Sequence, residues 1–269
     1  MPTPDVRLAV AGGVATLTLD SAHNRNALSR ALRQRLAEQL ARALADDAVR
    51  VLVLTHAGPV FCAGADLREP DAAPAPGAEL EDLLHTLWSV PKPVVARLAG
   101  TARGGGTGLV AAADVAVAAD TVTFAFPEVR LGVVPALISA PLRRRVAPRA
   151  LQELFLTGEV FDAPRAAEIG LLTAVVPAED LDAAVDRYVQ MLLRGAPAAL
   201  AATKELLAAP PPGGLAPELA ALARLSARHF ASPEAAEGRR AFAEKRAPAW
   251  AVDGPPTAGP AAPPQPPER

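Results

Sequence analysis

The sequence predicts an α/β fold, and two observations on its patterning carry this prediction. The runs at 51–55 and 93–100 are almost continuously apolar, which is typical of parallel strands buried on both faces. Segments with helical spacing of leucines alternate with such strands. Through residue 126 the predicted order is therefore strand–strand–helix–strand–helix–strand–helix–strand–strand, whereas only helices are predicted from Leu151 onward.

The chain opens with a predicted hairpin of strands 6–10 and 14–19, joined by a glycine turn at 11–13. Ser29 is the predicted N-cap of a helix that ends at Asp46 and Asp47, because its leucines recur every four residues. Those leucines are Leu32, Leu36, Leu40 and Leu44.

The remaining elements follow from the same two periodicities. Further strands are predicted at 51–55, 93–100, 114–118 and 121–126, and Pro127 breaks the last of them. Further helices are predicted at 80–88, 163–169, 181–193, 197–207, 215–230 and 233–245. Two segments rich in Pro and Ala have no apolar periodicity, so 68–77 is predicted to be mobile and 254–269 to be a disordered tail.

Composition excludes several classes of function. The 269 residues include 29 acidic and 27 basic side chains, and this balance gives no indication of a nucleic-acid or membrane-surface partner. Cys62 is the single cysteine, so an intramolecular disulfide is impossible, and no His/Cys cluster has the spacing of metal ligands. The polar N-terminus lacks the apolar region of a signal peptide, and no apolar run reaches the roughly 18–20 residues of a membrane span. We expect a cytoplasmic protein without a metal.

A glycine turn at 103–108 is the stretch on which we expect the rest of the chain to converge. It lies between a predicted strand and a run of small residues that begins a helix. Glycines permit a sharp turn and close approach of a ligand, and the first N–H groups of a helix have no internal acceptor. Such a turn suits a negative oxygen, although the glycines on their own favour a plain strand-to-helix turn in which they serve packing.

Five stretches together resemble the enoyl-CoA hydratase/isomerase family, the crotonase superfamily. Their order and spacing are specific, although each is weak alone. They are N-R-N-A-L at 24–28, F-C-A-G-A-D-L at 61–67, P-K-P-V at 91–94 leading to the glycines at 104–106, P-E-V-R-L-G-V-V-P at 127–135, and F-A-E-K-R at 242–246.

The resemblance implies an α/β, crotonase-like spiral of strand–strand–helix units with a helical C-terminal region used for trimerisation. The spiral core with the coenzyme A site would span 1–195, the helical region 196–253 and the tail 254–269. The implied substrate is an acyl-CoA thioester and the implied assembly a homotrimer or a dimer of trimers. Coenzyme A is part of the substrate, so no separate cofactor is expected.

The resemblance also assigns residues to the site. The backbone N–H groups of Ala65 and Gly105 would hold the thioester oxygen as it gains negative charge, and loss of one such donor costs about 10²–10³ in rate. Lys245 would reach the coenzyme A across a subunit boundary. The other implied substrate-binding positions are Arg25, Ala27, Ala63, Asp66, Leu67 and Gly108.

Glu128 is the expected acid/base, because it matches the family glutamate that exchanges a proton with the α-carbon. The second glutamate of the two-glutamate hydratases falls at Gly108, which cannot activate water. Overall resemblance favours a hydratase acting on a 2-enoyl-CoA. The mechanism alone favours a Δ3,Δ2-enoyl-CoA isomerase, which needs one carboxylate. A third hypothesis, from a different class, is a non-catalytic acyl-CoA binder.

Overall fold

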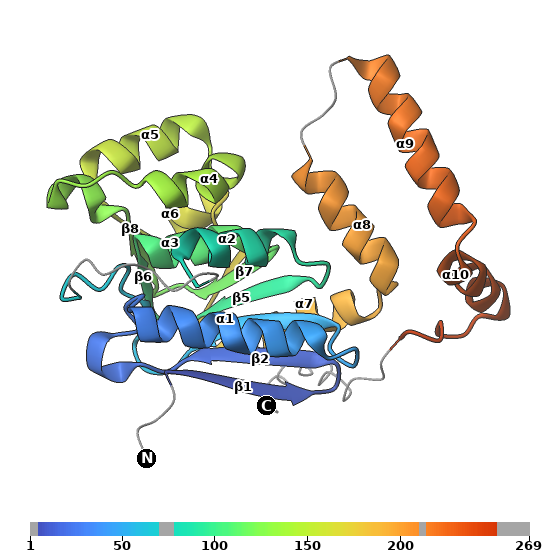
Figure 1. The fold of residues 1–269 in the computed structure, drawn as a ribbon, viewed down its shortest axis with the longest axis horizontal. Coiled ribbons are helices and arrows are strands. Elements are labelled where there is room, and N and C mark those ends of the chain that lie inside the picture. The colour runs from blue at the N-terminus through green and yellow to red at the C-terminus, as the bar shows by residue number, and fades with distance from the viewer. Residues whose placement is uncertain (1–4, 70–77, 210–213, 252–269) are drawn as a thin grey trace, which may run out of the picture.

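The structure is a computed structural model that describes residues 5–69, 78–209 and 214–251. Within this part of the chain, ten strands form two sheets, one in the order β1-β2-β3-β5-β7-β10 and one in the order β4-β6-β8-β9 (Figure 1). The strands are β1 (Val6–Ala11), β2 (Val14–Leu19), β3 (Val51–His56), β4 (Val60–Cys62), β5 (Val94–Leu98), β6 (Thr101–Arg103), β7 (Val115–Ala119), β8 (Thr123–Ala125), β9 (Val160–Asp162) and β10 (Ala174–Val176).

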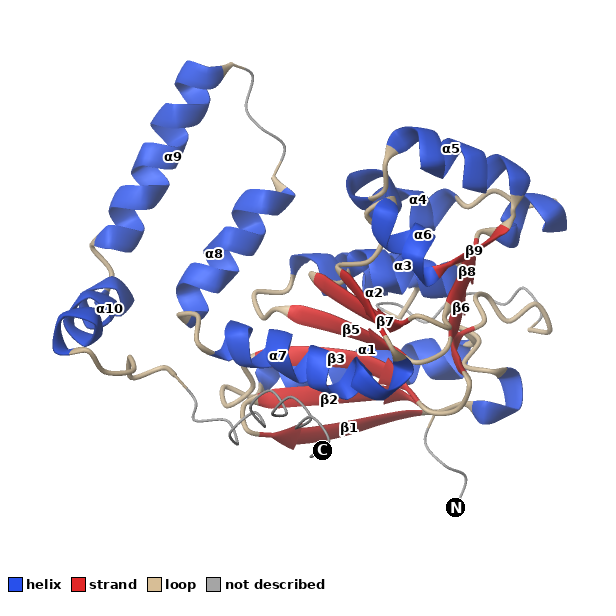
Figure 2. Cartoon of the chain, turned by 180° about the vertical axis from the view of Figure 1, so that it is seen from behind, coloured by secondary structure: helices blue, strands red, loops and turns tan. Residues whose placement is uncertain are grey.

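Helices cover both faces of the larger sheet and extend beyond it. The α-helices are α1 (Arg30–Ala45), α2 (Leu80–Ser89), α3 (Gly105–Ala112), α4 (Ala136–Arg145), α5 (Pro148–Thr157), α6 (Ala163–Glu168), α7 (Leu181–Leu193), α8 (Pro197–Ala208), α9 (Leu215–Phe230) and α10 (Pro233–Glu244). Short 3-10 turns η1 (Ala22–Asn24), η2 (Pro127–Leu131) and η3 (Ala178–Asp180) complete the described elements. Figures 1 and 2 place α1 and α7 on opposite faces of the sheet.

The first helix is fixed at both ends, as its sequence predicts at the N-terminus. The Ser29 side chain accepts a hydrogen bond from Leu32 N, and three of the four predicted leucines are fully buried against the sheet while Leu44 is partly buried. At the C-terminus, Lys92 Nζ donates to the carbonyl oxygens of Ala43, Leu44 and Asp46. The lysine therefore satisfies the orphan carbonyls of the last turn.

Three strand–strand–helix units are repeated along the chain: β3-β4-α2, β5-β6-α3 and β7-β8-α4. In each unit a long strand of the larger sheet continues into a three-residue strand of the smaller one. Because β4, β6 and β8 pair in parallel, the segments that follow them emerge side by side. This register brings three turns that are far apart in sequence to one place.

The sequence missed four short strands. The expectation that only helices follow Leu151 is wrong, because β9 pairs with β8 and β10 adds to the edge of the larger sheet beside β7. The strands β4 and β6 were absorbed into a loop and a turn. Each of the four is three residues long, which is too short for period-2 alternation to be visible.

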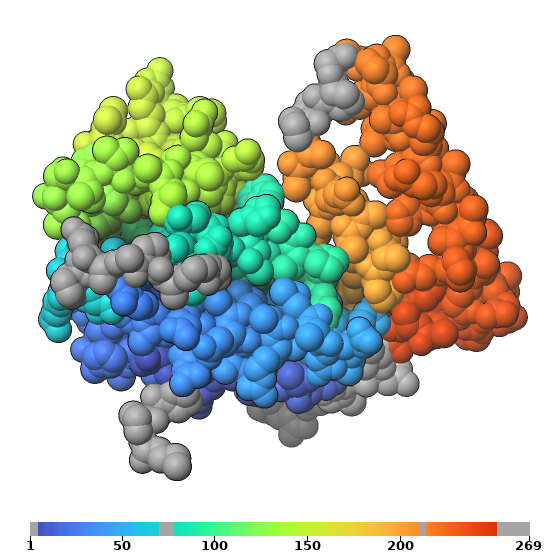
Figure 3. Space-filling model, viewed as in Figure 1, coloured from blue at the N-terminus to red at the C-terminus, as the bar shows by residue number. Residues whose placement is uncertain are grey.

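Helices α8–α10 form an arm beside the core, the orange and red segments of Figures 1 and 3. Arg50 holds both ends of this arm: Nη2 donates to Gly195 O and Nη1 to Trp250 O, each over 2.8 Å. Trp250 Nε1 in turn donates to Arg194 O over 3.1 Å. No residue of α9 is buried, although its sequence is amphipathic. The predicted tail 254–269 and residues 70–77 of the predicted mobile segment lie outside the described residues.

Candidate active site

The three turns after β4, β6 and β8 line one pocket of about 260 Å³. The first turn contributes the backbone around Ala65, the second Gly104 and Gly105, and the third Glu128. Apolar side chains of Leu80 and of the segment 131–138 form the remaining wall. The structure thus brings together the three residues predicted to be catalytic, which are 40 and 23 positions apart along the chain.

The glycine turn presents the start of α3 to the pocket. Gly104 has a φ of +46°, and its N–H donates to Ala125 O over 3.1 Å, which ties the turn to β8. Gly105 is the first residue of α3, so its N–H has no acceptor within the helix. A Cβ atom at Gly105 would lie 2.6 Å from Leu28 Cδ1, so a larger residue requires that leucine to move.

The loop that carries Ala65 packs directly against the glycine turn. Gly64 has a φ of +90°, and a Cβ built on it would lie 3.1 Å from Arg103 O and 3.7 Å from Gly105 N. Gly64 O accepts a hydrogen bond from Leu28 N over 2.7 Å. Among the described residues, neither Ala65 N–H nor Gly105 N–H donates a hydrogen bond to the protein. Both donors are therefore available to a ligand in the pocket.

Asp66 braces this loop. Its Oδ2 accepts a hydrogen bond from Asn24 Nδ2 over 3.0 Å, and its Oδ1 accepts one from Arg68 N over 3.1 Å. The Asn24 hydrogen bond lowers the pKa of Asp66 below its ordinary value, so the carboxylate stays charged in its bracing role. Asp66 thus fixes the backbone next to Ala65 rather than lining the pocket itself.

Glu128 faces the glycine turn from the third segment. A Cβ atom on Gly104 would lie 2.9 Å from Glu128 Oε1, so only glycine lets the carboxylate approach so closely. The carboxyl group is half-buried, and Oε2 is buried without a hydrogen-bond partner among the described residues. Burial raises the pKa of Glu128 above its ordinary value, which suits a group that accepts and returns protons.

Gly108 does not lie where the sequence placed it. It was expected to line the pocket beside Glu128, but it is buried on α3 and a Cβ atom there would lie 2.7 Å from Ile138 Cγ2 and 3.4 Å from Leu84 Cδ2. Ile138 itself lines the pocket. An apolar side chain of α4 therefore fills the space in front of Gly108. Sequence reasoning missed Ile138, because no motif marks it and only the packing of α3 on α4 reveals its position.

The other predicted substrate-binding residues divide into three groups. Ala63 and Leu67 line the pocket, and the Leu67 side chain is 72% exposed. Arg25 is exposed beside it, and its carbonyl accepts a hydrogen bond from Ala63 N, whereas Ala27 is buried beneath the loop. Lys245 caps the C-terminus of α10, which Figure 1 places on the side of the molecule away from α4.

Cys62 is a core residue and not a nucleophile. It is fully buried, and burial raises the pKa of its thiol to about 12. A Cβ atom on Gly106 would lie 2.7 Å from Cys62 Cβ, so the absence of a side chain at Gly106 permits α3 to pack on β4. Within the described residues, no group of three or more His, Cys, Asp or Glu side chains is arranged to hold a metal ion, and no helix is long and apolar enough to cross a membrane.

The pocket and its surrounding fold define a protein of the enoyl-CoA hydratase/isomerase class, and the chain belongs to that family: the family's sequence profile matches residues 9–253. A putative enoyl-CoA hydratase of Thermus thermophilus is 37% identical over 247 residues, which cover 88% of this chain and 97% of the relative. The crystal structure of an enoyl-CoA hydratase of Mycobacterium smegmatis is 33% identical with a TM-score of 0.84, covering 92% of this chain and 99% of that one. A putative enoyl-CoA hydratase of Mycobacterium avium paratuberculosis is 46% identical with a TM-score of 0.70, covering 91% and 98%.

Proposed function

We propose that this enzyme hydrates a 2-enoyl-CoA thioester with Glu128 as its single acid/base. The juxtaposition of Glu128 with the N–H groups of Ala65 and Gly105 in one pocket carries the proposal. The two donors bind the thioester oxygen and stabilise the negative charge that develops on it. Curated relatives that bear the name enoyl-CoA hydratase support the same reaction.

The proposed reaction needs only proton transfers within this pocket. The Glu128 carboxylate removes a proton from water as the water oxygen bonds to the β-carbon, and the electron pair of the double bond moves to the thioester oxygen as an enolate. The protonated carboxyl group then returns that proton to the α-carbon, and the carbonyl re-forms. Since no electrons leave the substrate, no cofactor is required besides the coenzyme A that is part of it.

One observation favours a second candidate, a Δ3,Δ2-enoyl-CoA isomerase. The pocket that contains Glu128 is otherwise lined by apolar side chains, among them Leu80, Leu137 and Ile138. A double-bond shift needs one group that removes a proton and returns it elsewhere, and an apolar wall excludes water from the intermediate.

Turnover of crotonyl-CoA and of a 3-enoyl-CoA, each with the native enzyme and with Glu128→Gln, tests these proposals. Hydration that the substitution abolishes supports the hydratase. Isomerisation without hydration, again dependent on Glu128, identifies the isomerase. Binding of acyl-CoA without turnover of either substrate overturns both and leaves a non-catalytic binder.

We further propose a homotrimer, or a dimer of trimers, in the cytoplasm. The exposed leucines at 215 and 219 on α9 and the exposed Phe230 at its end support an interface between subunits. In this assembly Lys245 contacts the coenzyme A of a neighbouring subunit and Arg25 that of its own. Light scattering with size-exclusion chromatography measures the assembly, and a monomer at micromolar concentration contradicts it.

A further inference from the structure

A groove between α2 and α4 leads away from the oxyanion pocket. It measures about 370 Å³ and shares Ala136 and Leu137 with that pocket. One wall is the face of α2 that carries Leu84 and Trp88, and the floor on α4 includes the small Ala136 and Ala140, one turn apart. An apolar chain that starts at the pocket can therefore follow α4 toward its C-terminus.

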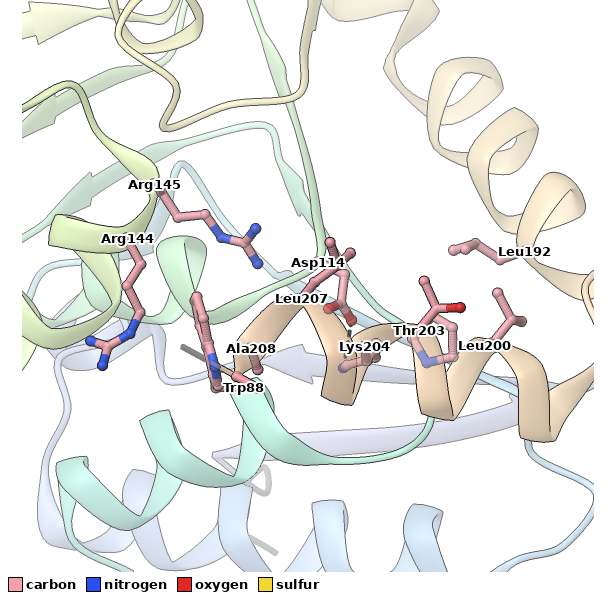
Figure 4. A pocket seen from close by; sticks show the side chains of 12 residues that line it. Trp88, Asp114, Arg144, Arg145, Leu192, Leu200, Thr203, Lys204, Leu207 and Ala208 are labelled. Carbon is pink, nitrogen blue, oxygen red and sulfur yellow. Dashed lines mark hydrogen bonds and ion pairs between the residues drawn. The ribbon is translucent and has the colours of Figure 1, made fainter. Parts of the chain in front are cut away.

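The far end of this groove is basic. There it adjoins a cavity of about 490 Å³, with which it shares Trp88, Arg144 and Ala208. Figure 4 shows the Trp88 ring between Arg144 and Arg145, whose guanidinium carbons lie 6.0 and 4.6 Å from the ring centre. Stacking on the indole holds the two cations in place through cation–π attraction.

The charges in this cavity do not cancel. Lys204 Nζ lies 2.6 Å from Asp114 Oδ2, so these two groups neutralise each other, as the dashed line in Figure 4 marks. Arg144 and Arg145 then remain as two positive charges, and the lining contains no second carboxylate among the described residues. A ligand group bound here is therefore expected to be an anion.

The two arginines keep donors for such an anion. Arg145 donates from Nε and Nη2 to the carbonyls of Ala111 and Ala113 over 3.4 and 3.3 Å, which ends α3. Arg144 donates from Nη1 to Ala140 O over 2.6 Å. Each guanidinium has five N–H groups, so either one retains enough to bind a carboxylate.

The near end of the groove is negatively charged, because Glu81 lies there. The distance from this end to the arginines sets the length of the acyl chain. Glu81 lines the groove at the first turn of α2, about 10 Å along the helix from Trp88. On the other wall, Ala136 and Arg144 are separated by about 12 Å of helix. An extended chain of single bonds advances about 1.2 Å per bond, so about ten bonds join the pocket to the arginines.

We propose that the acyl group of the substrate carries a terminal carboxylate, which Arg144 binds at the end of the α2–α4 groove, while Arg145 on the other side of the Trp88 ring adds positive charge nearby. The substrate class is thus a medium-chain dicarboxylic acid joined to coenzyme A at one end. This rests on the proposed function. A short dicarboxylic chain places its carboxylate next to Glu81 instead and is disfavoured.

The test compares 2-decenoyl-CoA with the same thioester that bears a terminal carboxylate, for the native enzyme, Arg144→Gln and Arg143→Gln. Arg143 is the matched control, because it is exposed on the same helix and lines neither the groove nor the basic cavity. The native enzyme is expected to prefer the carboxylate-bearing substrate by about tenfold in kcat/KM, chiefly through KM. Arg144→Gln is expected to lower kcat/KM for the carboxylate-bearing substrate far more than for the plain chain and so to remove the preference, whereas Arg143→Gln retains it.

Calorimetric binding of decanoyl-CoA and its terminally carboxylated form distinguishes failure of this inference from failure of the proposed function. The carboxylated ligand could still bind more tightly through Arg144 although neither enoyl substrate is turned over. In that case the proposed reaction is wrong, and the inference that the groove binds a terminal carboxylate is supported. Equal affinity for both ligands overturns the inference, as does a loss in Arg144→Gln that both ligands share or that Arg143→Gln reproduces. A hexenedioyl-CoA that gains as much as the longer chain also overturns it.

Discussion

Ile138 Cγ2 lies 2.7 Å from the point where Gly108 would carry a Cβ atom. The two residues face each other across the contact between α3 and α4, and Leu84 of α2 closes the third side. The absence of a second carboxylate at Gly108 is thus coupled to the presence of a branched apolar side chain. A glutamate introduced at position 108 without a smaller residue at position 138 is therefore not expected to act as a second catalytic base.

Gly108→Glu alone is expected to lower stability and leave crotonyl-CoA hydration no higher, because the new side chain overlaps Ile138. The double variant Gly108→Glu, Ile138→Gly is expected to raise hydration by at least about tenfold, since a positioned base contributes roughly 10²–10⁴. Isomerisation of a 3-enoyl-CoA should fall or stay level. Ile138→Gly alone is the control. A well-folded Gly108→Glu single variant with increased hydration contradicts the packing argument.

Two substitutions at Gly105 distinguish the loss of its N–H donor from the steric effect of an added side chain. Gly105→Ala and Gly105→Pro add a Cβ at the same place against Leu28, but only proline removes the N–H, and proline is accepted at the first position of a helix. In a Leu28→Ala background, which supplies the space, the proline variant is expected to lose about 10²–10³ in kcat relative to the alanine variant. Circular dichroism checks that both are folded. Equal turnover of the two removes Gly105 from the oxyanion role.

Glu128→Gln is expected to abolish turnover while it stabilises the fold at neutral pH. Burial raises the pKa of Glu128, so the folded state binds a proton more readily than the unfolded state, whose ordinary value is 4.5. Native stability therefore falls as pH rises from 4.5 through the raised value, a loss that the neutral amide avoids. We expect Glu128→Gln to melt at a higher temperature than the native protein at pH 8, with no difference near pH 4. A lower melting temperature at both pH values contradicts this account.

The same shift predicts the pH dependence of catalysis. Only the carboxylate form of Glu128 can remove a proton, so kcat/KM is expected to fall as pH drops through its raised pKa. A profile of kcat/KM against pH, measured with enzyme that remains folded at each point, locates this limb. If kcat/KM instead falls only at the ordinary pKa of a solvated glutamate, burial does not raise the pKa of Glu128.

Lys204→Met is expected to destabilise the fold by about 3 kcal/mol, because it leaves the largely buried Asp114 carboxylate without its counter-charge. Asp114 Oδ2 also accepts a hydrogen bond from Val94 N over 2.7 Å. The double variant with Asp114→Asn removes the stranded charge and keeps an acceptor for Val94, so it should recover part of the loss. Denaturant unfolding measures both. A loss below about 1 kcal/mol for Lys204→Met would place this pair with ordinary surface ion pairs.

The sequence predicted those parts of the fold where periodicity is long enough to be visible. The helices 181–193 and 215–230 match the structure at both ends, and Ser29 caps α1 as expected. The strands at 101–103 and 174–176 were missed, because three residues show no period and their partners come from distant segments. Local pattern contains no information on such pairing.

The sequence predicted the catalytic residues of the site but not the apolar residues that line its pocket. The family motifs pointed to Ala65, Gly105 and Glu128, and the structure places all three on one pocket. Their approach depends on the parallel pairing of β4, β6 and β8, which spacing along the chain does not encode. Ile138 was missed for the same reason, since its effect comes from the contact of two helices that the sequence alone does not orient.

Arg50 gives the C-terminal arm a pivot. Because a single guanidinium grips both Gly195 O and Trp250 O, the arm leaves and rejoins the core at nearly one point. Lys204 also ties α8 to Asp114 of the core, so α9 and α10 are the part of the arm that can move without pulling on the strands beneath it, and the entropy of closing such a loop changes only slowly with its length. Insertions, deletions and new subunit contacts within α9 and α10 can therefore accumulate over evolution while the geometry around Glu128 stays intact.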